Sequence, residues 1–351
     1  MLSRARLHRP LETMAIAAAV VAAASIGYAQ APLNSPVPVI LNILTVNDNL
    51  DRTLEFYHHL LGLQSADADP RARLAWYPQA PQLDDMYSIR SDTRNFFLKI
   101  PGSDLILEPE QFRASNARRL DAHVQDPGAV QLIFYTRDLD TLTGWLVRGR
   151  AKVLTRGGKP VRVETERGSA REVLIEDFNG FFVKLVERQN EPKPVPAPGL
   201  APSPYINGAT IGIVVQDIEK TARFYREALG IAVTVPASFV TDAQEVSALG
   251  LTGAQYRESA AALPEKTPPL HFFEFKSVTQ KPLHPAIADP NAVVIRVNVP
   301  NIEAAMAKAK TAGASVISAS GGITVFGRNH FLMLKDPDGI YLQLTERFPA
   351  P

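Results

Sequence analysis

Two glutamates at corresponding places in the two halves of the sequence, Glu108 and Glu274, are suited to acid–base chemistry. Each lies in a strand-like run, and a carboxyl group whose pKa is raised by burial can exchange a proton near neutral pH. The alternative is an ordinary strand carboxylate that is solvated or held in a salt bridge. His271 stands three residues before Glu274, so on a straight strand the two side chains point to opposite faces. The sequence therefore does not predict a joint site for this pair.

The composition excludes several other chemistries. The 351 residues contain no cysteine, which rules out a thiol nucleophile, a disulfide and a thiolate metal site. The formal net charge is +1 and no basic block stands out, so nothing indicates nucleic-acid binding. Hydrophobic residues make up 46% of the chain, enough for a substantial core. The length predicts two domains with short additional segments.

Residues 1–31 have the pattern of a secretory signal peptide. Arg4, Arg6 and Arg9 precede an apolar run of small residues, and a cleavage point follows Ala29. The run is short for a membrane span. We expect a periplasmic or secreted protein without a membrane span beyond this segment; an uncleaved N-terminal anchor is the alternative.

One order of elements recurs along the remaining chain. Val39–Val46 is a β-rich run, and apolar residues at helical spacing follow it, with Asp48 or Asn49 as the N-cap and Gly62 at the end. Strand-like stretches come next, at Met86–Arg90, Asn95–Ile100 and Leu105–Pro109. The order restarts with strands at Val130–Thr136, Ala209–Val215 and Val293–Val299, followed by helices at Leu139–Arg148, Ile218–Leu229 and Ile302–Ala312. We therefore predict four modules, two in each half.

A turn followed by a strand closes each half. Asp336-Pro337-Asp338-Gly339 is typical of a type I turn, and Gln343 lies four residues past its glycine, as Lys184 lies four past Gly180. The proline-rich stretch 189–204 is typical of a semi-rigid linker. We expect one domain at 37–188 and a second at 205–348, and the two could pair within the chain.

Three stretches resemble the vicinal-oxygen-chelate superfamily, which includes glyoxalase I, extradiol dioxygenases and bleomycin-resistance-like binding proteins. They are TVNDNLDRTLEFYHHLLGL, VVQDIEKTARFYREALGI and KDPDGIYLQLTE. The resemblance implies an α+β fold of tandem glyoxalase-like domains, in which four βαβββ modules pair into two cup-shaped half-barrels. It also implies a small-molecule ligand and, in many members, a divalent metal.

The resemblance assigns each module one metal-ligand position on its first strand and one on its last. In the first half these positions fall on Asn42, Glu108, Gln131 and Lys184, and in the second half on Thr210, Glu274, Val294 and Gln343. None of them is histidine, and an ammonium group at Lys184 works against a bound cation. Lys184 could instead pair with Glu108. Glu108 and Gln131 are the remaining candidate ligands for a divalent metal.

Three hypotheses follow. The first is metal-independent binding of a small molecule in a cup whose ligand set is degenerate. The second is a metal-dependent lyase or ring-cleaving dioxygenase that uses Glu108, Gln131 and Asn42 together with water. The third is that one half serves only as the structural partner of the other. No cofactor and no catalytic residue is assigned.

Overall fold

The structure, a computed structural model, describes residues 37–67, 74–103, 105–113, 117–165, 168–188, 205–263 and 270–347. The predicted signal peptide (1–31) and the predicted linker (189–204) lie outside these residues. None of the helices in the described part of the chain has the length and apolar character that a membrane span needs.

Four modules follow one another along the chain. The first contains β1 (Val39–Val46), α2 (Leu50–Leu54), the π-helix η1 (Glu55–Leu60), β2 (Gln64–Ser65), β3 (Tyr77–Pro78), α3 (Pro81–Tyr87), β4 (Asp92–Asn95), β5 (Leu98–Lys99) and β6 (Ile106–Phe112). The second contains β7 (Val130–Thr136), α4 (Leu139–Arg148), β8 (Lys152–Val153), β9 (Val161–Thr165), β10 (Gly168–Glu176) and β11 (Phe182–Arg188). The third contains β12 (Ile206–Val214), α5 (Ile218–Leu229), β13 (Ala232–Thr234), α6 (Ala243–Ala248), β14 (Gln255–Ala262) and β15 (Leu270–Lys276). The fourth contains β16 (Val293–Asn298), α7 (Ile302–Thr311), β17 (Ser315–Val316), β18 (Thr324–Phe326), β19 (Asn329–Lys335) and β20 (Tyr341–Arg347).

The helix caps explain why the first part of each module was predictable. Each main helix begins after a polar residue whose side chain accepts a backbone N–H three positions on, at Asn49, Asp138, Asp217 and Asn301. The predicted strand Met86–Arg90 is wrong, because its first two residues end the helix α3, which starts at Pro81, and its last three belong to no strand. The helix α6 and the strand β14 were not predicted.

The four modules form two sheets, and each sheet joins modules from both halves of the sequence. In the 11-stranded sheet β1 pairs antiparallel with β16, which links the first module to the fourth. In the 9-stranded sheet β7 pairs antiparallel with β12, which links the second module to the third. We call the faces of these sheets that turn away from the four main helices the β1/β16 cup and the β7/β12 cup.

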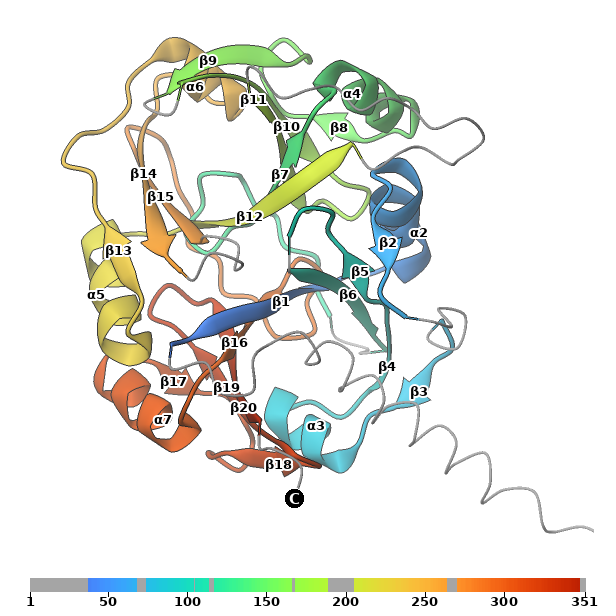
Figure 1. Ribbon diagram of the computed structural model, residues 1–351, viewed down its shortest axis with the longest axis vertical. Coiled ribbons are helices and arrows are strands. Elements are labelled where there is room, and N and C mark those ends of the chain that lie inside the picture. Colours follow the sequence, from blue (N-terminus) through green and yellow to red (C-terminus); the bar gives the residue numbers. More distant parts are fainter. Residues whose placement is uncertain are drawn as a thin grey trace, which may run out of the picture.

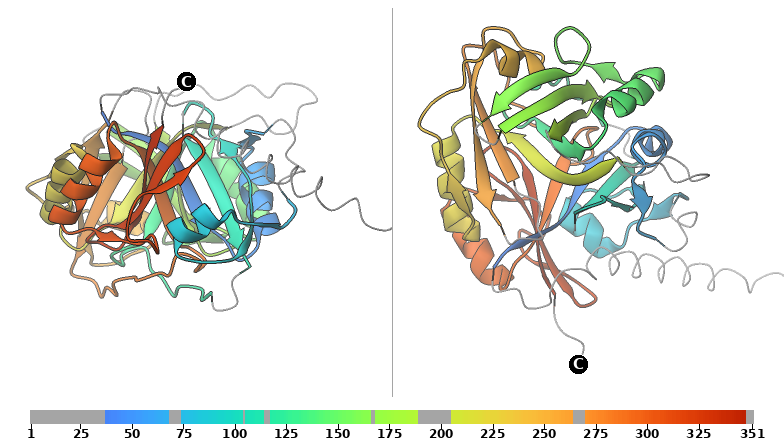
Figure 2. Two further views of the ribbon diagram at one scale, coloured as in Figure 1. Left: turned by 90° about the horizontal axis from the view of Figure 1, so that it is seen from below. Right: turned by 45° about the horizontal axis from the view of Figure 1, so that its top comes forward.

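Two helix pairs connect the sheets on their other faces. The helix α5 packs against α7 on one side of the molecule, and η1 packs against α4 on the other (Figure 1; Figure 2). The largest apolar cluster lies between these helices and the sheets, and it includes Phe56, Tyr57, Phe224 and Tyr225. Burial of these rings against both sheets makes the two halves one core.

Two connections, one from β6 to β7 and one from β15 to β16, hold the sheets in this arrangement. The buried Asp126 accepts a hydrogen bond from Lys281 N at 2.8 Å, and the buried Asp289 accepts one from Arg118 N at 2.8 Å. Each aspartate therefore ties its own connection to the corresponding connection of the other half. This reciprocal contact explains the matching Asp-Pro dipeptides that the two halves carry.

Candidate functional site

The four predicted first-strand positions are buried on the cup faces of their strands. Each lies seven residues before the N-cap of its module's main helix, at Asn42, Gln131, Thr210 and Val294, and none is more than 1% exposed. The residues that alternate with them, such as Ile43 and Ile211, face the helix core. All four positions therefore lie on the face of their strand that turns away from the helix core.

The last-strand positions follow from the register between strands. Glu108 lies beside Leu44, and Lys184 lies beside Ile133. Each of these neighbours is two residues past the first-strand position of its module. Gln343 follows the same rule, because it lies beside Arg296, two residues past Val294. In the third module the rule selects His271, which lies beside Gly212.

The assignment of Glu274 to a cup is consequently wrong. Its carboxylate faces the helix side, where it accepts a hydrogen bond at 3.0 Å from Ile218 N at the start of α5. The other modules place a Glu or Gln three residues past the last-strand position in the same role, at Gln111, Glu187 and Glu346. This three-residue spacing is the sequence signal that identifies His271.

The strand pairing also regroups the predicted positions. The β1/β16 cup contains Asn42, Glu108, Val294 and Gln343, and the β7/β12 cup contains Gln131, Lys184, Thr210 and His271. Grouping by sequence halves was wrong because the first strands of modules from different halves pair with each other. Glu108 and Gln131 lie in different sheets, so the reduced metal site predicted from them does not exist.

A buried arginine that sequence reasoning missed occupies the centre of the β1/β16 cup. Arg296 donates to a carboxylate oxygen of Glu108, to Gln343 Oε1 at 2.7 Å and to Tyr87 Oη at 3.1 Å. Asn42 and Asn95 donate to the same carboxylate at 2.7 and 2.9 Å. Glu108 is 2% exposed and Arg296 8%. The network therefore satisfies both charges without solvent.

Apolar side chains cover this polar network and close the cup. Tyr87 reaches in from α3, and the cluster around it contains Leu44, Val46, Met86, Phe112, Val294, Phe331, Met333 and Tyr341. Because Val294 is one of these residues, one predicted ligand position contributes only packing. The described residues of the β1/β16 cup therefore form a packed core.

Glu110 beside this network should make stability depend on pH. Burial, with repulsion from Glu108, raises the pKa of Glu110 to about 7. The folded protein then keeps a proton that the unfolded chain releases, so this stability is complete below about pH 4.5 and is lost as the pH rises through 7. Burial also raises the pKa of Asp177 to about 6 and that of Asp336 to about 7. Both shifts likewise make the folded state less stable as the pH rises. Melting temperatures should therefore rise as the pH falls from 8 to 6.

Glu110→Gln isolates one of these groups. The amide resembles the protonated acid, so it should raise the melting temperature at pH 8 and flatten the pH dependence in differential scanning calorimetry. Glu164→Gln, at an exposed site, is the matched control and should leave both unchanged. A lower melting temperature for Glu110→Gln at pH 8 would contradict the assignment.

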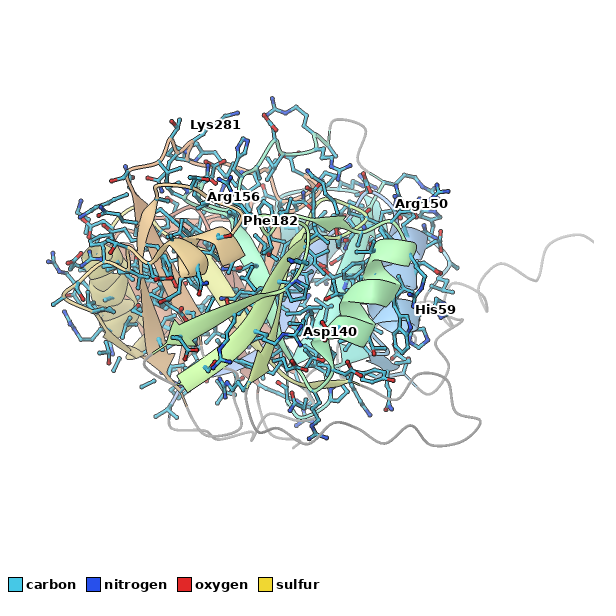
Figure 3. All side chains as sticks on the ribbon, turned by 90° about the horizontal axis from the view of Figure 1, so that it is seen from above. His59, Asp140, Arg150, Arg156, Phe182 and Lys281 are labelled. Carbon is cyan, nitrogen blue, oxygen red and sulfur yellow. The ribbon has the colours of Figure 1, made fainter. Side chains whose placement is uncertain are left out.

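The β7/β12 cup, in contrast, contains a cavity of about 330 Å³. Its walls come from β9, β10 and β11 on one side and from β14, β15 and α6 on the other. Figure 3 views this half of the molecule from above, where Phe182 and Asp140 are labelled. Both paired modules therefore contribute to one site.

On one wall Lys184 forms a buried ion pair with Glu172. The Nζ–Oε2 distance is 2.6 Å, and both side chains are about nine-tenths buried. The predicted pairing of Lys184 with Glu108 is wrong, because the two residues belong to different sheets. Burial acts to lower the pKa of Lys184, but attraction by Glu172 and Glu258 outweighs it and the pKa is raised. The ammonium group therefore stays charged.

On the opposite wall two carboxylates are hydrogen-bonded to the side chains of His271 and Tyr256. Glu258 bonds His271 Nδ1, and Glu245 accepts a hydrogen bond from Tyr256 Oη at 2.8 Å. His271 is 3% exposed, and its Nε2 has no hydrogen-bond partner among the described residues. Burial raises the pKa of Glu245, and the charges of Asp242 and Glu172 add to the shift.

The residues at the ligand positions do not fit a divalent metal in either cup. In the β1/β16 cup the guanidinium group of Arg296, which is always charged, is already hydrogen-bonded to Glu108 and Gln343. In the β7/β12 cup Lys184 places a cation at one position, and the Thr210 hydroxyl is hydrogen-bonded to Tyr135 Oη at 3.1 Å. Within the described ranges no three His, Asp or Glu side chains converge as metal ligands.

Comparison with known proteins agrees with this architecture. Residues 208–344 match the model of the Glyoxalase/Bleomycin resistance protein/Dioxygenase superfamily. The match covers the third and fourth modules. No curated protein matches the sequence.

Solved structures extend the likeness to most of the chain. Glyoxalase I from Zea mays superposes with a TM-score of 0.56 at 18% identity, covering 88% of this chain and 92% of that one. A putative dioxygenase from Bacillus subtilis superposes with a TM-score of 0.52 at 13% identity, covering 90% and 87%. At these identities the likeness concerns the fold, which the superfamily uses for different reactions.

Proposed function

We propose that the protein is exported and binds a small organic molecule in the β7/β12 cup, without a metal at the superfamily's ligand positions. The contrast between the two cups carries the proposal. One is closed by Arg296 and apolar side chains, whereas the other keeps a cavity of about 330 Å³ lined by buried ionisable groups. A concave pocket with a few converging polar groups is the usual form of a ligand site.

Lys184 supports the metal-free form of this proposal. It supplies a fixed positive charge inside the cavity, and Glu172 holds it in place. The ammonium group stands at the ligand position itself, so a divalent ion coordinated there would have to displace it from Glu172. The signal-peptide pattern around Ala29 supports export.

Elemental analysis of the protein purified without chelator from the periplasm or medium tests metal independence and export together. The mature chain should begin at Gln30 and contain less than about a tenth of an equivalent of iron, manganese, nickel or zinc. About one equivalent would overturn the metal-free proposal, and an intact N-terminus would overturn cleavage.

Ligand screening by thermal shift then tests the cup itself, because a ligand that binds only the native state raises the melting temperature. A hit should stabilise the wild type but not Ala170→Trp, which adds a large ring on the cup face of β10. Glu110→Gln in the β1/β16 cup is the control and should respond like the wild type. Equal stabilisation of Ala170→Trp would place the ligand elsewhere.

A further inference from the structure

The charges inside the β7/β12 cavity are unbalanced. Among the described residues, three carboxylates from three elements line it, Glu172 on β10, Glu245 on α6 and Glu258 on β14, while Lys184 is the buried ammonium. The two arginines that line the cavity do not restore the balance. Arg257 is bound by Glu219 and Glu274 outside it, and Arg188 is exposed at the rim. The part of the lining that the structure describes is therefore predominantly acidic.

The carboxylates of the cavity affect the pKa of Lys184. Burial alone would lower the pKa of a lysine, yet that of Lys184 is raised by the attraction of Glu172 and Glu258. A second positive group in the cavity would meet the same attraction.

The hydrogen-bonding groups on the far wall are acceptors. An ionised Glu258 can only accept, so the proton in its bond to His271 lies on Nδ1. In the neutral imidazole His271 Nε2 then carries a lone pair, and this buried atom lacks a partner among the described residues. A buried acceptor without a donor is unfavourable, and a ligand N–H group would satisfy it.

Two aromatic side chains complete the cavity. Tyr256 and Tyr135 line it, and Tyr135 already accepts a cation on its ring, because the guanidinium carbon of Arg188 lies 4.4 Å from the ring centroid. Aromatic rings beside carboxylates are a common environment for organic ammonium groups.

We propose that the β7/β12 cup recognises a small organic amine or amidine through Glu245, Glu258 and His271. The inference rests on the proposed function, since it assigns a ligand class to the same cavity. The charged nitrogen of the ligand lies between Glu245 and Glu258 and donates to His271 Nε2. The apolar part of the ligand contacts Tyr135 and Tyr256. Lys184 remains bound to Glu172 and disfavours ligands with a second cation.

Three probes of similar size and different charge test this ligand class by calorimetric titration of the full mature chain. They are 2-phenylethylamine, 2-phenylethanol and phenylacetate. The amine should bind at least about tenfold more tightly than the alcohol, and phenylacetate should bind most weakly. Equal affinities, or tighter binding of phenylacetate, would overturn the ligand class.

Isosteric variants locate the interaction. Glu245→Gln and Glu258→Gln should each weaken amine binding about tenfold, because they remove charge but keep the side-chain shape. Glu303→Gln on α7 is the matched control: it makes the same chemical change at an exposed position outside the cavity, so the affinity should change less than about twofold. Unchanged affinity in both cavity variants would overturn the assignment.

The result separates this inference from the proposed function. If no probe binds while a compound of another class stabilises the wild type but not Ala170→Trp, the ligand class is wrong and the cup still binds ligands. If no compound gives a stabilisation that depends on the cavity, the proposed function fails and this inference with it.

Discussion

Arg296→Met should lower the free energy of unfolding by about 3–5 kcal/mol, the usual effect of removing one partner of a buried ion pair. Methionine fills much of the volume but leaves the Glu108 carboxylate without a cation in a site that is 2% exposed. It also removes the donors that Gln343 Oε1 and Tyr87 Oη now share. Urea denaturation monitored by circular dichroism measures the loss.

The double variant Arg296→Met/Glu108→Gln separates the lost ion pair from lost packing. It removes both charges, so it should recover most of the stability, and the double-mutant cycle should give a coupling of about 2 kcal/mol or more. A loss below about 1 kcal/mol in Arg296→Met would mean that solvent reaches Glu108 and that the cup is not closed.

The sequence predicts the modules well because their signals are local. Asn49, Asp138, Asp217 and Asn301 each cap a helix within three residues, and each can be recognised without knowledge of distant parts of the chain. The turns at Asp177 and Asp336 are local in the same sense. The aromatic pairs Phe56-Tyr57 and Phe224-Tyr225, which follow two of these caps, are buried at helical spacing.

The candidate site is less predictable because its contacts join distant segments. Arg296 lies two residues past Val294, and its importance emerges only when β16 pairs with β1 beside Glu108. The sequence argument that His271 and Glu274 face opposite sides is correct, but without a turn landmark before β15 the register was assigned to the wrong residue. His271, which faces the cavity, was therefore set aside.

Separating the two halves of the chain should abolish the fold of each, the largest effect that we expect. A fragment of residues 37–188 would contain β1 and β7 without their partners β16 and β12. It would also lose α5 and α7 from the shared core and expose apolar strand edges, which promote aggregation. We expect the isolated fragments to be unfolded or aggregated by circular dichroism and size-exclusion chromatography.

A nicked chain provides the control for this prediction. With a protease site inserted in the linker 189–204, the cleaved protein should elute as one particle with a 1:1 ratio of fragments and should dissociate only in denaturant. The strand pairs β1–β16 and β7–β12 would hold the fragments together without a covalent connection. A fragment of residues 37–188 that is a folded monomer with a cooperative melting transition would contradict the pairing, because each sheet needs one module from either side of the linker.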